Sequence, residues 1–167
     1  MGNLINRVAT WFIQSAISVV SLPFMAVATA DTATRERGMA MRIDVYPCAV
    51  DIIFKGTIVA INAAGFLAPA GDTAATFVVG IAEKNVDNSG GSAGDLSCPV
   101  RSGVVVRLAA EDTTMAQTSV GETATAEDDL TVGLAADTTN DISVGRIVEF
   151  VSATEVWVFI PPCGAIA

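Results

Sequence analysis

The residues best suited to chemistry lie in a loop between two apolar, β-branched runs, Val78–Leu108, which reads VVGIAEKNVDNSGGSAGDLSCPVRSGVVVRL. A run of Asp, Asn, Ser and Gly could cradle a phosphate or wrap a calcium ion. However, GGSAGD lacks both the GK[ST] ending of a phosphate loop and the GxGxxG pattern of a dinucleotide loop. It also misses the calcium repeat GGxGxD, because Ala93 holds the fourth place. We therefore expect residues 87–91 to turn the chain through Asx hydrogen bonds and positive φ, and 87–95 to bind no metal or cofactor.

The chain has no histidine, which removes the usual general base and the commonest zinc ligand. The three cysteines share no metal-ligand spacing and are odd in number, so free thiols are expected: Cys48, Cys98 and Cys163. The adjacent acids Glu127, Asp128 and Asp129 would point to opposite faces of a strand, so we interpret them as a solvated turn. No catalytic residue is predicted, and we expect that the protein is not an enzyme.

The charge is unevenly distributed along the chain. The net charge is −9, made of +2 over residues 1–42 (four Arg, two acids) and −11 over the rest (five basic residues, sixteen acids). No cluster of Lys or Arg occurs, which argues against a nucleic-acid partner. Residues 111–141 contain acids and no Lys or Arg, and we expect this stretch to face solvent or the axis of an oligomer.

Short β-branched runs separated by turn residues dominate the sequence after Arg42, which predicts a mainly β fold: a compact β-sandwich or β-barrel-like body over residues 35–167. The predicted strands are Val50–Phe54, Thr57–Ile61, Phe66–Leu67, Phe77–Glu83, Leu96–Val100, Val104–Leu108, Val144–Val151 and Glu155–Ile160. One short helix is expected over residues 113–120, ended by Gly121. Both faces of Val156–Ile160 are apolar, so we expect this strand to be covered on both sides, with Trp157 and Phe159 in the core or an interface.

Residues 1–34 differ from this body. They are apolar near helical spacing up to Pro23 and predict a partly helical arm that docks on a partner. An alternative is a secreted or periplasmic β-domain whose signal peptide is cleaved after Ala30. A membrane span is disfavoured, because polar residues and Pro23 interrupt the apolar stretch. The candidate interface residues are the large apolar groups of the arm and the basic residues that follow: Trp11, Phe12, Phe24, Arg35, Arg37 and Arg42.

The body contains these sequence pieces in order: KGTIVAINAAGFLAPA, GIAEKNVDNSGGSAGD with VRSGVVVRL, DLTVG, and VGRIVEF with VWVFI. In the order of these pieces the chain resembles the capsid cement or head decoration proteins of tailed bacteriophages. The resemblance implies a β-rich subunit on the outer surface of the virion head that binds the major capsid protein and cements capsomers without a cofactor. It also implies self-association. A homotrimer at local threefold positions is the first expectation, and a dimer at twofold positions is the alternative.

Overall fold

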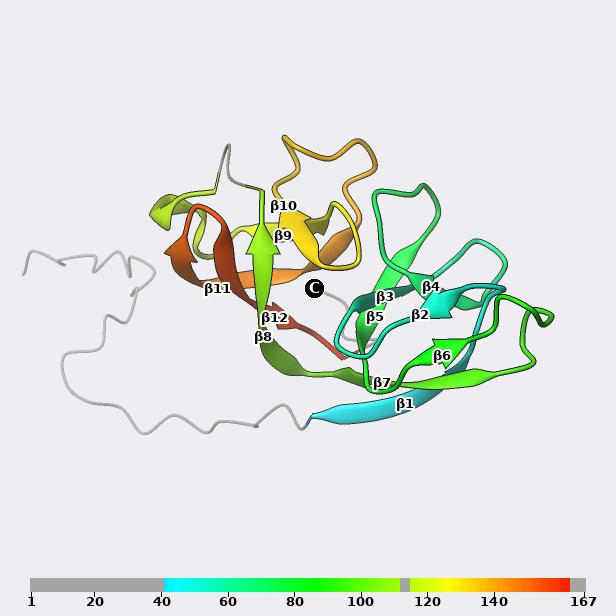
Figure 1. Cartoon of the computed structure of the whole chain (residues 1–167). Coiled ribbons are helices and arrows are strands. Elements are labelled where there is room, and N and C mark those ends of the chain that lie inside the picture. The colour runs from blue at the N-terminus through cyan, green and yellow to red at the C-terminus, as the bar shows by residue number, and fades with distance from the viewer. Residues whose placement is uncertain (1–40, 112–114, 163–167) are drawn as a thin grey trace, which may run out of the picture. The chain divides into compact units, whose positions relative to one another are not determined.

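The computed structural model describes residues 41–111 and 115–162 of the chain. Within this part nearly all regular structure is β, with one 3-10 turn, η1 (Gln117–Ser119). Figure 1 shows a sheet that adjoins a closed barrel, so the predicted mainly β class with a barrel-like body is confirmed. The predicted arm, residues 1–34, lies outside the described residues.

The sheet has five strands in the order β1-β7-β5-β3-β4, and every neighbouring pair is antiparallel. The strands are β1 (Arg42–Pro47), β7 (Ser97–Ser102), β5 (Phe77–Ala82), β3 (Ile58–Ile61) and β4 (Leu67–Pro69). A small antiparallel pair, β2 (Ile52–Ile53) with β6 (Val86–Asp87), contributes Ile53 and Val86 to the core on one face of this sheet. That core also contains Val59, Leu67 and Val100, because alternate residues of a strand point to the same face.

The barrel closes in the order β10-β8-β12-β11-β9. Its strands are β8 (Val104–Ala110), β9 (Thr123–Ala126), β10 (Thr131–Gly133), β11 (Ser143–Ser152) and β12 (Glu155–Ile160). Gly103, with φ of 69°, separates β7 from β8 and lets one continuous run of chain serve both the sheet and the barrel. Closure leaves the barrel without an open edge.

A second core joins the two layers. It contains the barrel interior, with Ile147, Val156 and Val158, together with Ile58 and Ile81 from the other face of the five-stranded sheet. All five side chains are at most 3% exposed. The sheet therefore packs on both of its faces near β3 and β5, with the barrel on one side and the β2–β6 pair on the other.

The described residues bury only one face of the last strand, so Trp157 and Phe159 do not lie in the core, and an interface over them stays a prediction. Along β12 only Val156, Val158 and Ile160 are buried, while Trp157 and Phe159 are half-buried on the outer face of the barrel. The strict alternation arises because β12 is a barrel strand, of which only the inward face lies in the core. Trp157 is instead the cross-strand neighbour of Arg107 on β8.

Several boundaries also differ from the prediction. The Val50–Phe54 run contributes only the two residues of β2, and the helix is a single turn, while 113–114 of its predicted range lie outside the described residues. Gly121 does adopt a positive φ of 94° after this turn. The prediction missed four strands: β1, β6, β9 and β10. Three of them, β6, β9 and β10, have at most four residues, whereas β1 has six.

Candidate interaction surface

The strand β1 forms one edge of the five-stranded sheet. Among the described residues, Figure 1 shows β7 along one side of β1 and no strand along its other side. The register pairs Ile43 with Arg101 and Val45 with Pro99, so these side chains share one face of the sheet. On the same face Arg101 lies opposite Ile81, which is buried against the barrel. The face that packs against the barrel at β5 thus continues to β1.

Where this face of the sheet reaches β1, no other described residues cover it. Met41, Ile43 and Val45 are 56%, 54% and 66% exposed, although all three are large and apolar. Isolated apolar side chains are common on protein surfaces, but a row of three on an open strand edge is typical of an interaction surface. We call Met41, Ile43 and Val45 the β1 apolar row.

The opposite face of β1 carries charge. Arg42 Nε donates a hydrogen bond to Asp44 Oδ1 at 3.0 Å and lies 2.8 Å from Oδ2 of the same carboxylate, as an ion pair. Of the six predicted interface residues, only Arg42 lies among the described residues, and its side chain is 58% exposed. The other five, Trp11, Phe12, Phe24, Arg35 and Arg37, lie outside them. The structure places Arg42 on the open edge strand, next to the β1 apolar row that the sequence analysis missed.

The pattern that marks this strand is visible in the sequence. In Arg42-Ile43-Asp44-Val45-Tyr46 polar and apolar residues alternate with period two, as in a half-exposed strand. The apolar residues would ordinarily be assigned to the core. Only the strand order, which puts β1 at the edge beyond the barrel, shows that they face outward.

Further large apolar side chains are exposed at the β2–β6 pair. Val50, Ile52 and Phe54 are 53%, 39% and 58% exposed. They belong to the layer that covers the other face of the sheet, so they form a separate surface from the β1 apolar row.

The glycine-rich loop after β6 is a set of turns, as predicted. Asp87 Oδ1 accepts hydrogen bonds from the N–H and the hydroxyl of Ser89, at 3.1 Å and 2.6 Å, and these bonds hold the pKa of Asp87 below its ordinary value. Asp95 Oδ2 accepts from the N–H of Ser92 at 2.7 Å. The positive φ falls at Gly94, at 92°, and not at Gly90 or Gly91 as expected.

Asn88 organises this loop and was not singled out by the sequence analysis. Its side chain is 2% exposed and its Nδ2 donates to the carbonyls of Ala49, at 2.8 Å, and Ser92, at 2.9 Å. A Cβ on Gly91 would lie 2.6 Å from Asn88 Oδ1, so glycine at this position makes room for the amide. The loop is therefore fastened to the segment that follows β1.

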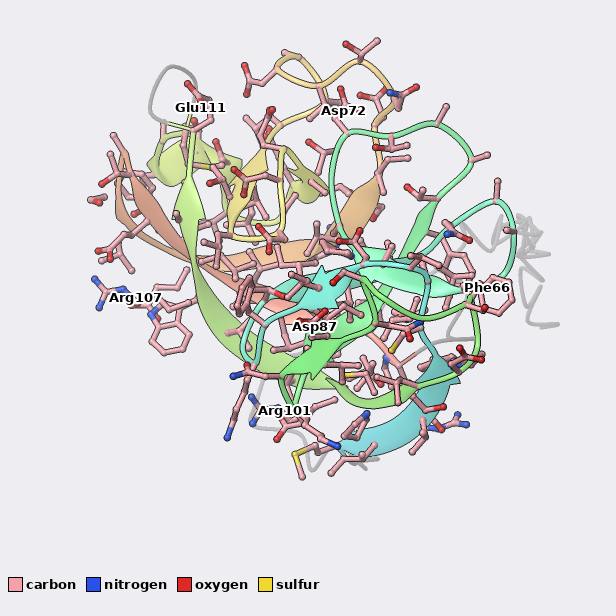
Figure 2. The ribbon with its side chains drawn as sticks, turned by 45° about the vertical axis from the view of Figure 1, so that its right-hand side comes forward. Phe66, Asp72, Asp87, Arg101, Arg107 and Glu111 are labelled. Atoms are coloured by element: carbon pink, nitrogen blue, oxygen red, sulfur yellow. The ribbon has the colours of Figure 1, made fainter. Side chains whose placement is uncertain are left out.

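Acidic side chains gather on the loops of the body, and Asp72 has a specific role among them. Its carboxylate accepts hydrogen bonds from the N–H groups of Thr139 and Asn140, both at 2.7 Å, and its carbonyl accepts from Asn140 Nδ2 at 2.9 Å. These bonds hold the pKa of Asp72 below its ordinary value. They tie the loop between β4 and β5 to the loop between β10 and β11, and Figure 2 shows Asp72 on the same side of the molecule as Glu111.

The predicted solvated turn at Glu127, Asp128 and Asp129 is formed only in part. Asp128 is exposed, and its Oδ1 accepts from the N–H groups of Leu130 and Thr131, both at 2.7 Å. Glu127 and Asp129 are half-buried, and burial, followed by neighbouring carboxylates, raises the pKa of each. Within residues 41–111 and 115–162, no group of His, Cys, Asp and Glu is arranged to hold a metal ion.

Cys48 and Cys98 are buried free thiols, and burial raises the pKa of both, which disfavours the reactive thiolate. Cys163 lies outside the described residues. None of the helices in the described part of the chain is long and apolar enough to cross a membrane.

No protein-family model and no curated protein matches this chain.

Proposed function

We propose that this protein is a structural subunit of a tailed bacteriophage head, which binds the outside of the capsid lattice and cements neighbouring capsomers. The partner is the major capsid protein, and the site of action is the outer surface of the virion. The proposal rests on the resemblance of the strand and loop segments to head decoration proteins. The observation that carries the assembly role is the β1 apolar row, which lies on an open strand edge and is uncovered among the described residues.

The physical features of the body support an assembly role. Apolar side chains at an open edge can be covered by another chain, and the exposed backbone groups of an edge strand can accept an additional strand. A subunit that binds only the expanded lattice stabilises that lattice by mass action, and many modest contacts act together on one shell.

In this proposal the arm supplies the main contact with the shell. Trp11, Phe12 and Phe24 are large apolar residues, each of which contributes on the order of 2 kcal/mol when buried on a partner. Arg35 and Arg37 follow the arm directly and help to give residues 1–42 a net charge of +2, opposite in sign to the −11 of the rest of the chain. We place the arm toward the shell and the acidic stretch 111–141 toward solvent.

Binding of the full chain to expanded and unexpanded heads of its cognate capsid protein tests this function. We expect saturable binding to expanded heads, with increased resistance of those heads to heat. Replacing Trp11 by Ala should weaken binding about tenfold or more, whereas the matched replacement of Phe77, an aromatic residue 52% exposed on the body, should leave it unchanged. Absence of binding, or equal binding to both kinds of head, contradicts the proposal.

A further inference from the structure

The open edge of β1 presents backbone hydrogen-bonding groups in a known alternation. The N–H of Cys48, directly after the strand, donates to the carbonyl of Leu96 at 2.8 Å and continues the β1–β7 ladder. Even-numbered residues of β1 therefore direct their backbone groups toward β7, and Ile43 and Val45 direct theirs outward. Pro47, which has no N–H, falls in the outward series, as is usual for proline on an edge strand.

The same strand is self-complementary in charge. If a second copy of β1 runs antiparallel along this edge with Ile43 opposite Ile43 of the other copy, Arg42 lies opposite the other copy's Asp44, and Asp44 opposite its Arg42. Met41 lies opposite Val45 in the same register. The charged pairs then occupy non-hydrogen-bonded positions, where side chains of an antiparallel pair are closest.

The neighbouring registers that keep the outward hydrogen bonds are disfavoured. Shifting the second strand by two residues in one direction places Arg42 opposite Arg42. Shifting it in the other direction places Asp44 opposite Asp44 and sets Pro47, with no donor, against Met41. Like charges directly opposite each other destabilise a strand pair, so the register centred on Ile43 is preferred.

We propose that two copies of this chain associate through their β1 edges, antiparallel and centred on Ile43, into one continuous ten-stranded sheet with five strands from each copy. The two β1 apolar rows then lie side by side across the twofold axis, and each edge strand satisfies the other's backbone groups. This pairing does not depend on binding to a phage head. It favours the twofold arrangement over the threefold one expected from the resemblance.

The interface is small, since it consists of one strand pair. Contacts that bury less than about 1,200 Å² are weak, and we expect half-maximal dimerisation of the free protein at a concentration on the order of 100 μM. Sedimentation velocity over a concentration series that spans this value measures the concentration of half-maximal dimerisation. A protein that stays monomeric throughout, or that forms trimers, overturns the proposal.

Charge exchange tests the register. Asp44→Arg places Arg42 opposite the introduced arginine of the other copy, and Arg42→Asp places like acids opposite each other, so each variant alone should dimerise about tenfold more weakly. Mixing the two variants restores opposite charges in the heterodimer, and the double variant Arg42→Asp/Asp44→Arg restores the homodimer. Far-ultraviolet circular dichroism of each variant controls for folding. Equal dimerisation by all variants, or no recovery in the mixture, overturns the register.

Amide hydrogen exchange gives an independent readout on the full chain. The N–H groups of Ile43 and Val45 should become protected as the concentration rises, whereas those of Asp44 and Tyr46, which point toward β7, should be protected at every concentration. Protection of Ile43 and Val45 that does not change with concentration would mean that another part of the same chain covers the edge. That result, or their lack of protection at high concentration, contradicts a second copy as the occupant.

Discussion

The buried amide of Asn88 should be worth more to stability than any other polar side chain of the glycine-rich loop. Asn88→Ala removes two short hydrogen bonds, to the carbonyls of Ala49 and Ser92, and a longer one of 3.5 Å to the carbonyl of Cys48. The Ser92 carbonyl keeps the bond from the N–H of Asp95, but no other bond to the Ala49 carbonyl is found in the described part of the chain. A lost hydrogen bond costs about 1 kcal/mol and an unsatisfied buried acceptor about 1–3 kcal/mol, so we expect a loss of about 2–3 kcal/mol in the free energy of unfolding.

Urea unfolding of the full chain, followed by tryptophan fluorescence, measures this loss. Asn85→Ala is the matched control. Asn85 also accepts a loop hydrogen bond, from the N–H of Lys55 at 2.6 Å, but it is exposed, and water can replace it, so this change should cost less than about 1 kcal/mol. If both variants lose the same stability, then burial of Asn88 does not fasten the loop and the reasoning is refuted.

Two further perturbations probe the barrel and its acidic loops. Gly145→Ala would place a Cβ 2.0 Å from the carbonyl oxygen of Phe159, so we expect this change to separate β11 from β12 and to lower the free energy of unfolding in urea by at least about 2 kcal/mol. The control Gly90→Ala adds its Cβ in open space and should change the free energy of unfolding by less than about 0.5 kcal/mol. Similar losses for both variants would contradict the tight approach of β11 to β12. The pKa of Glu127 is raised in the folded state, so folding favours the protonated carboxyl. The stability that the protonated form contributes at low pH is therefore lost as the pH rises through the folded-state pKa. Glu127→Gln should therefore stabilise the protein at pH 7 and have little effect well below the ordinary glutamate pKa, and a pH-independent difference in thermal unfolding would contradict this.

The mainly β class could be predicted because β-branched runs and turn residues are local signals. The start of β8 at Val104 and the run Glu155–Ile160 were predicted at their observed positions, since short β-branched and apolar runs are recognisable without tertiary information. The division into a five-stranded sheet and a closed barrel was not predictable in the same way. It depends on which strands pair across long separations, such as β1 with β7.

The exposure of the β1 apolar row could not be predicted from the sequence. Ile43 and Val45 alternate with Arg42 and Asp44, so the strand could have been found, but the apolar side would have been assigned to the core. Its exposure follows from the position of β1 at the sheet edge, beyond the extent of the barrel. The burial of Asn88 could not be predicted either, because an Asn in a Gly-rich loop ordinarily faces solvent. Here contacts with a distant segment of the chain bury its side chain.

The proposed location of the protein on a phage head is tested most directly by electron cryo-microscopy of expanded heads of the cognate capsid protein after addition of the purified full chain. The account predicts density for the β body on the outer surface, at one class of symmetry positions with a fixed copy number, bridging adjacent capsomers. It further predicts paired bodies related by a twofold axis at β1. Heads without added density, or with density at random or internal positions, would contradict the cement function.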